Sequence, residues 1–182
     1  QSIEYLDPNR ADISVIGHGD AHNGNVFLYD KHLLYFDPAF AGRHNPLLDL
    51  AKPIFHNVFA MWMYFPRIKQ VNTPISMYLK GSSLHVDYQY VLPQVRRMFL
   101  QSKLEYVLYP LLKHLKESGQ LRIDWRTYLK SALFCCPFLT LNLCDKNRFP
   151  SEITLLGFAM AVEMGAESYD KRSLIDTILD TV

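Results

Sequence analysis

Two carboxylates and one amide near the beginning of the chain have a spacing suited to phosphoryl transfer on magnesium. Asp20 is followed five residues later by Asn25, and Asp37 comes twelve residues after Asn25. Phosphoryl transfer needs a group that orients the accepting hydroxyl and metal ions that neutralise phosphate charge. Asp20 suits the first role, because a carboxylate can accept the hydroxyl proton. Asn25 and Asp37 suit the second, because magnesium prefers hard oxygen ligands.

A short loop rich in glycine is expected to hold Asp20. Residues 13–16, Ile-Ser-Val-Ile, are β-prone and lead into this loop over residues 17–24, which contains three glycines. Glycine tolerates backbone angles that other residues avoid. The run therefore predicts a tight turn with Asp20 on it.

A β-hairpin is expected directly after the loop. The apolar runs 26–29 and 33–36 are separated by Asp30-Lys31-His32, a polar turn segment. Asn25 stands before the first strand and Asp37 after the second. Because a hairpin brings its two ends together, we expect Asn25 and Asp37 to share one magnesium ion.

The motif run resembles the catalytic segment of the aminoglycoside phosphotransferase and choline kinase superfamily, the small-molecule branch of the protein-kinase-like fold. The pattern of that segment is His-Gly-Asp-x-His-x-x-Asn, and residues 18–25 match all of its fixed positions. The later Asp-Leu-Ala element of the family is matched by Asp49-Leu50-Ala51. The match spans residues 13–52, and beyond them the likeness is only general helicity.

The resemblance implies a role for each motif residue. Asp20 corresponds to the catalytic aspartate, and Asn25 and Asp37 correspond to the ligands of the Mg²⁺ that accompanies ATP. His22 is either structural or close to the phosphates, and we count it with Asn25 and Asp37 as cofactor-binding. Two further residues are expected to brace the catalytic loop: His18 and Asp49.

The resemblance also implies an α+β fold that is mainly α-helical, the C-terminal lobe of a protein-kinase-like fold with a small β-hairpin at the catalytic loop. Within a single domain, residues 1–52 would carry the loop and the metal-binding hairpin, and residues 53–182 would form a helical acceptor-binding subdomain. The helices are expected at 46–61, 87–117, 125–134, 152–169 and 173–179, with breaks at 66–74 and 81–83. Four large side chains are expected in their core: Trp62, Met63, Phe99 and Phe158.

A nucleotide-binding lobe is not found before the motif. A kinase of this kind needs a glycine-rich strand pair and a lysine over the ATP phosphates, both preceding the catalytic loop. Only seventeen residues precede His18, and they contain no lysine and no Gly-x-Gly-x-x-Gly. We therefore expect the chain to be the C-terminal lobe of a larger kinase, with its missing N-terminal lobe as a partner, and to be inactive by itself.

Two other interpretations stay open. His18, Asp20 and His22 are also ligand types for zinc or manganese, as in a metal-dependent phosphoesterase. A phosphoesterase site of this kind requires further histidines in glycine-rich turns. The downstream histidines are instead scattered, at His44, His56, His85 and His114. The other alternative is a catalytically silent kinase-like binding module.

Composition favours a cytoplasmic enzyme domain. The 182 residues include 19 basic and 18 acidic side chains, and no stripe of Lys and Arg with interleaved aromatics predicts nucleic-acid binding. The chain has no run of about 18 apolar residues and does not begin like a signal peptide, so we expect no membrane insertion. Cys135, Cys136 and Cys144 are expected to be reduced core residues.

The charge distribution bears on the small-molecule acceptor, whose hydroxyl would receive the phosphoryl group. Ten basic residues lie between positions 50 and 122: Lys52, Arg67, Lys69, Lys80, Arg96, Arg97, Lys103, Lys113, Lys116 and Arg122. A basic surface matches a neutral or anionic acceptor better than a polycation. The C-terminal segment is acidic instead, so an amino alcohol or aminoglycoside becomes the acceptor if that segment lines the pocket.

Overall fold

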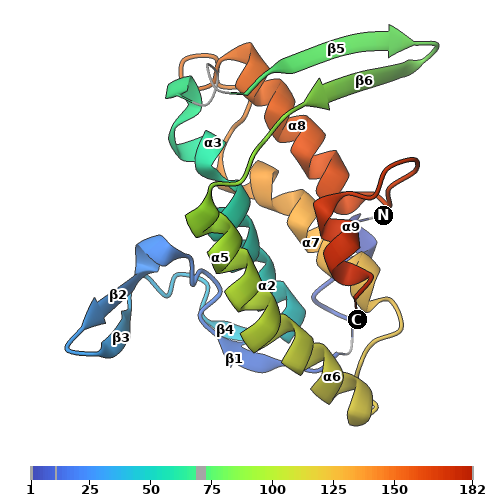
Figure 1. The fold of residues 1–182 in the computed structure, drawn as a ribbon. Helices are drawn as coiled ribbons and strands as arrows, with labels where there is room; N and C mark the ends of the chain where they lie inside the picture. Colours follow the sequence, from blue (N-terminus) through green and yellow to red (C-terminus); the bar gives the residue numbers. More distant parts are fainter. Residues whose placement is uncertain (1, 11, 69–72, 182) are drawn as a thin grey trace.

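The computed structural model describes residues 2–10, 12–68 and 73–181, and shows a mainly helical α+β fold with small antiparallel sheets (Figure 1). Helices α2 (Pro46–Ile54), α7 (Trp125–Thr140) and α8 (Ser151–Gly165) pack together as its centre. The short helix α1 (Ser2–Tyr5) packs on α7, and α9 (Leu174–Leu179) packs on α8. The predicted fold class is confirmed at this level.

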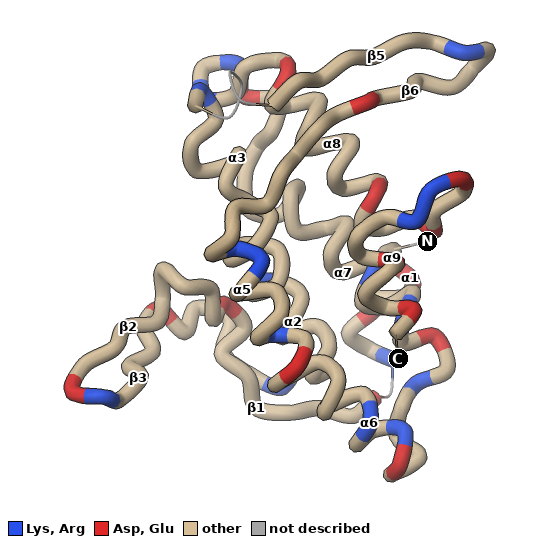
Figure 2. Tube along the Cα trace, viewed as in Figure 1, with Lys and Arg blue, Asp and Glu red and all other residues tan. Residues whose placement is uncertain are grey.

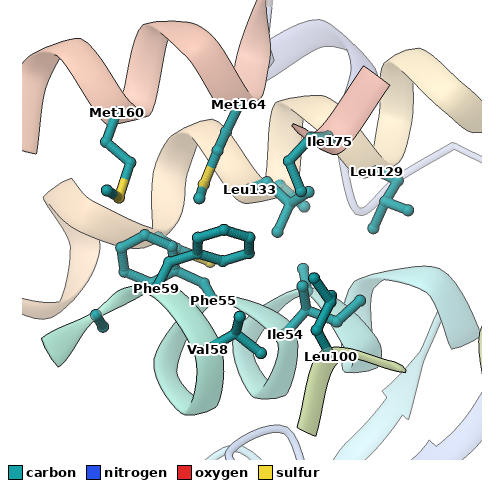
Figure 3. Close-up of a cluster of buried hydrophobic side chains, with 14 of the residues drawn as sticks. Ile54, Phe55, Val58, Phe59, Leu100, Leu129, Leu133, Met160, Met164 and Ile175 are labelled. Atoms are coloured by element: carbon teal, nitrogen blue, oxygen red, sulfur yellow. The ribbon is translucent and has the colours of Figure 1, made fainter. Parts of the chain in front are cut away.

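One continuous apolar core joins these helices (Figure 3). Phe55 and Val58 are fully buried and lie among side chains from α7 and α8. Trp62 and Met63 are also fully buried, as predicted. Burying each such side chain contributes about 1.5–3 kcal/mol. The prediction for Phe158 is wrong, because this residue is 38% exposed, with its ring stacked on Phe138 of α7.

Predicted helix 46–61 is present but changes its winding after Pro53. Helix α2 starts at Asn45, whose side chain accepts a hydrogen bond from Leu47 N at 2.8 Å. It passes into the π-helix η2 (Phe55–Phe59) and then into α3 (Met61–Tyr64). A proline inside a helix removes one i→i−4 hydrogen bond, which favours such a local change. The helix ends before the predicted break, of which positions 69–72 lie outside the described residues.

A second hairpin interrupts the helical region and was not predicted. Strands β5 (Ile75–Lys80) and β6 (Ser83–Tyr88) pair antiparallel around Gly81 (Figure 1). Residues 87 and 88, where the predicted helix 87–117 was expected to start, belong to strand β6 instead. The helix begins only after Pro93. It runs as α5 (Gln94–Lys103), the π-helix η3 (Leu104–Leu108) and α6 (Tyr109–Glu117), and the chain then turns at Gly119 with φ +68°.

Three helix ends differ from the predicted ones. Helix α7 continues through Pro137 to Thr140 instead of ending near Phe134. Helix α8 begins after Pro150 without a side-chain cap and ends at Gly165, four residues before the predicted end. The Asp124 carboxylate does not cap α7, because it accepts a hydrogen bond from Arg122 Nε at 2.6 Å. Helix α9 is capped by Ser173, whose side-chain oxygen accepts a hydrogen bond from Asp176 N at 3.1 Å.

The N-terminal strands form two small sheets. Strand β1 (Val15–Gly17) pairs with β4 (Gly42–His44), and β2 (Val26–Tyr29) pairs with β3 (His32–Tyr35). The predicted hairpin is therefore confirmed, with a two-residue turn at Asp30 and Lys31. Both turn residues have positive φ, +44° and +63°. The hairpin extends away from the helices (Figure 1).

A cluster of charges ties the C-terminal segment to α7. The Asp176 carboxylate is fully buried and pairs with Lys130 and with Arg126, the latter at 2.8 Å. Two acids around it also form ion pairs: Glu167 with Arg126, and Asp180 with Arg172. The acidic tail is thus neutralised largely by basic residues of the chain itself.

Two further expectations concern membranes and cysteines. No helix in the described ranges is long and apolar enough to cross a membrane.

All three cysteines are free thiols. Cys136 is buried and Cys135 is partly buried, but Cys144 is exposed, so the prediction that it is a core residue is wrong.

Candidate functional site

Asp49 and two glycines close the motif loop onto helix α2. Gly19 N donates a hydrogen bond to Asp49 Oδ1 at 2.9 Å. Gly19 has φ +74°, and a Cβ atom there would collide with the carbonyl oxygen of Phe40. A Cβ atom at Gly17 would lie 2.5 Å from Asp49 Oδ2. The glycines therefore permit a close approach that any side chain would block.

His18 connects the loop to the end of the β2–β3 hairpin. Its Nε2 lies 2.8 Å from the carbonyl oxygen of Phe36, and its Nδ1 accepts a hydrogen bond from Asp20 N at 3.3 Å. Both contacts are satisfied by the neutral tautomer that carries its proton on Nε2. His18 thus holds the backbone of Asp20 and the residue before Asp37 in one arrangement.

Asn25 lies where the hairpin begins and is oriented by the loop. Its Nδ2 donates to the carbonyl oxygen of Asp20 at 3.0 Å, so Oδ1 is the side-chain atom left for a cation. The carbonyl oxygen of Asn25 accepts from Phe36 N at 2.9 Å. This backbone bond brings Asn25 beside the residue that precedes Asp37.

Asp37 is exposed and has φ +51°. Within the described part of the chain, its carboxylate takes part in no hydrogen bond or ion pair. Magnesium is commonly held by one or two protein oxygens, with phosphates and waters completing the shell. An Asn25–Asp37 pair fits this pattern. The ranges described contain no group of three or more His, Cys, Asp or Glu side chains suited to a metal.

His22 caps the short 3₁₀-helix η1 (Asn23–Asn25). Its Nδ1 accepts a hydrogen bond from Gly24 N at 3.0 Å, which leaves the proton on Nε2. That Nε2 lies 3.7 Å from Asp20 Oδ1. His22 therefore shapes the loop and also faces the Asp20 carboxylate.

Asp20 itself is only 13% exposed and pairs with Lys52 of α2. The distance from Lys52 Nζ to Asp20 Oδ1 is 2.7 Å, but the alignment is not that of a hydrogen bond, so this buried oxygen accepts none. The ammonium group also lies 5.0 Å from the centre of the Phe40 ring. Sequence analysis did not identify Lys52 as a site residue, although it stands three positions after Asp49 on one helix face.

The π-helix η2 places two buried polar residues beneath the loop. Asn57 Oδ1 accepts a hydrogen bond from Asn23 N at 2.7 Å. The His56 ring lies 2.8 Å from Tyr64 Oη and 3.1 Å from Thr140 Oγ1. Burial, together with the positive charge of Lys52 and the nearby His22, lowers the pKa of His56 to about 4. His56 is thus neutral at pH 7. Neither His56 nor Asn57 was predicted from the sequence to belong to the site.

Two cavities lie outside the loop region. One of about 570 Å³ is lined by β6, α8 and α9, and one of about 620 Å³ by α5, η3 and α9. Neither cavity is lined by a residue of the motif. The candidate site is therefore the partly exposed surface that surrounds Asp20.

No family model, curated protein or solved structure matches the chain.

Proposed function

We propose that the chain is the catalytic and metal-binding part of an ATP-dependent phosphotransferase, which transfers the γ-phosphoryl group to a hydroxyl of a small molecule. In this proposal it is the C-terminal lobe of a protein-kinase-like fold. The observation that carries the proposal is the arrangement around Asp20. One partly buried carboxylate is held by a loop whose neighbours include an oriented amide and an unpaired carboxylate.

Each residue has a task that follows from its contacts. Asp20 accepts the proton of the acceptor hydroxyl, and the ion pair with Lys52 holds its carboxylate in place. Asn25 Oδ1 and Asp37 hold Mg²⁺, which neutralises phosphate charge when it is bound. Asp49 and His18 fix the loop backbone, so Asp20 needs no rearrangement before reaction.

The replacement Asp20→Asn tests the proposal in the full-length protein. An amide cannot accept the hydroxyl proton, and we expect phosphoryl transfer from Mg·ATP to fall roughly 10²–10⁴-fold. Transfer is measured on a panel of sugars, hydroxy acids, amino alcohols and aminoglycosides, with circular dichroism as the check on folding. Asp30→Asn, at the exposed hairpin turn, is the matched control and is expected to stay active. Unreduced transfer by Asp20→Asn would contradict the assignment.

A further inference from the structure

Arg96 of α5 reaches the support of the motif loop without meeting an acid. Its Nη1 donates to the carbonyl oxygen of Asn57 at 2.6 Å, and its Nη2 lies 2.8 Å from Met61 Sδ. No Asp or Glu within the ranges described lies at ion-pair distance from it. A guanidinium carries five N–H donors. Several of these donors, and the whole charge, are thus left for another acceptor.

Asn57 is a buried donor beside this guanidinium. The residue is 3% exposed, and its Oδ1 is occupied by Asn23 N. Its Nδ2 has no hydrogen-bond partner in the structure. An unsatisfied buried amide costs free energy, and buried polar groups in folded proteins are rarely left in this state. The unpaired Nδ2 therefore points to a ligand that the site takes up.

Asp20 and Arg96 share a neighbour, Tyr64. The Tyr64 hydroxyl lies 2.8 Å from His56 Nδ1. Burial and the Asp20 carboxylate raise the pKa of Tyr64, while the Arg96 guanidinium opposes that shift. The phenol thus lies within electrostatic range of both groups. Lys52 pairs with Asp20, and Asn57 joins the loop at Asn23 N to Arg96 through its own carbonyl oxygen. We call these donors and the Tyr64 hydroxyl the donor cluster: Lys52, Asn57, Tyr64 and Arg96.

Three acids of the C-terminal segment are occupied by contacts within the chain. Asp176 pairs with Lys130, and Asp180 pairs with Arg172 at 2.6 Å. Glu163 accepts a hydrogen bond from the Tyr88 hydroxyl, in the cavity lined by β6 and α8. These three acids thus serve internal contacts and are not free to attract a cationic acceptor. Figure 2 shows basic residues at the start of α5, the helix that packs on η2.

We propose that the donor cluster binds an anionic group of the acceptor, a carboxylate or a phosphate, so that the phosphotransferase acts on an acidic metabolite. Arg96 and the Asn57 amide donate the hydrogen bonds, and Lys52 supplies a second positive charge beside the reacting hydroxyl. The identity of the ligand as acceptor rests on the proposed function. The binding of an anion at these residues does not.

Binding is tested in the full-length protein with inorganic phosphate and, separately, with glycerate. The signals of the Asn57 side-chain amide and of Arg96 Nε are followed by NMR during each titration. We expect saturable shifts of both signals. The anion that binds more tightly identifies the group recognised. Absence of shifts with both anions would overturn the inference.

Two variants remove the donors in different ways. Asn57→Asp keeps the acceptor for Asn23 N but replaces the unpaired NH₂ with an oxygen, and Arg96→Gln removes the guanidinium charge. Each should weaken anion binding by about tenfold or more, as expected for loss of a charge-assisted hydrogen bond. Arg97→Gln is the matched control, because Arg97 is the next residue of α5 and its Nε donates to Leu92 O. An equal loss in Arg97→Gln would refute the site.

The outcomes separate this inference from the proposed function. Transfer to acidic acceptors, with a KM raised about tenfold in Asn57→Asp, is the expected result. Transfer confined to neutral or cationic acceptors would overturn the inference alone. Anion binding without any transfer would overturn the proposed function. Displacement of phosphate by a non-hydrolysable Mg·ATP analogue would assign the donor cluster to the nucleotide, and so also overturn the inference.

Discussion

Asp37 combines an unfavourable backbone angle with an exposed carboxylate. A non-glycine residue at φ +51° costs free energy, and such residues gather at functional sites. The hydrogen bond between Phe36 N and the Asn25 carbonyl fixes the chain immediately before it. The position of the carboxylate is thus determined by the ends of the hairpin.

Asp37→Ala is expected to weaken Mg²⁺-dependent nucleotide binding in the full-length protein. Changing a residue that only supports a metal ligand typically lowers metal affinity by roughly tenfold or more. Asp37 is a direct ligand in the proposed site, so its loss should lower the affinity for Mg²⁺ by at least that factor. Calorimetric titration with and without Mg²⁺ measures the effect. Asp30→Ala is a matched control, since Asp30 also has positive φ and an exposed side chain. Unchanged Mg²⁺-dependent binding in Asp37→Ala would remove this residue from the metal site.

His56 makes the stability of the fold depend on pH. Its pKa is about 4 in the folded protein and 6.5 as its ordinary value. Between pH 6.5 and 4 the His56 side chain is protonated in the unfolded chain but still neutral in the folded protein, so a falling pH favours unfolding. The contribution of His56 to the free energy of unfolding is therefore fully present above pH 6.5 and is lost as the pH falls towards 4. The loss is on the order of 3 kcal/mol at most. Urea unfolding between pH 7 and 4 measures it, and His56→Gln should flatten the profile. An unchanged slope would contradict this prediction.

At the scale of elements, the turn of the β2–β3 hairpin offers a clear test of backbone strain. Asp30 and Lys31 both adopt positive φ, as the two central residues of a type I′ turn do. Lys31→Gly should therefore stabilise the hairpin by about 1 kcal/mol. Slower amide hydrogen exchange at the cross-strand bonds of β2 and β3 would show it. Gly is expected to have no such benefit at Ser82, in the β5–β6 turn, where only Gly81 has positive φ.

The sequence predicts those elements whose signals are local. The β2–β3 hairpin follows from two apolar runs and a polar turn, and α9 lies within the predicted amphipathic segment 173–179. The β5–β6 hairpin was missed, although Ile75, Met77 and Leu79 alternate with polar residues and pair with an apolar face of β6. Helix α7 contains the buried Pro137 and continues for three exposed residues to Thr140, whose hydroxyl donates to the Cys136 carbonyl oxygen, so a local helix breaker does not end it.

The site residues likewise fall into two groups: those indicated by local sequence spacing and those brought to the site by packing. The motif spacing indicates Asp20, Asn25 and Asp37, because these residues lie on one loop and its adjoining hairpin. Lys52, Asn57 and Arg96 could not be assigned in this way, because their contacts depend on how α2, η2 and α5 pack beneath the loop. Packing of distant segments leaves no fixed spacing in a sequence.

At the scale of the whole molecule, the buried Asp176 joins the C-terminal segment to α7. Burial alone would raise the pKa of this carboxyl, but hydrogen bonds from Lys130 and Ser168 hold it well below its ordinary value. Asp176→Ala leaves the buried Lys130 ammonium with only Glu167, at 3.5 Å, as an acidic partner and should destabilise the fold by about 3–5 kcal/mol. Thermal and urea unfolding measure the change.

An exposed ion pair provides the control for this prediction. Lys113 Nζ and Glu117 Oε1 lie 3.9 Å apart on α6, and both side chains are more than half exposed. Glu117→Ala should change the free energy of unfolding by only about 0–1 kcal/mol. A similar effect of the two substitutions would mean that burial does not strengthen the Asp176 pairing.

The π-helix η2 has a consequence for how the chain length can vary. A π-turn is equivalent to an α-helix that carries one additional residue, so removing one residue from 55–59 would restore α-helical winding while α2 and α3 keep their relative rotation. The shortened chain could retain its helical frame and still lose the displaced backbone that presents Asn57 to the loop. Related chains that differ by a single deletion here would then share an architecture but not a ligand.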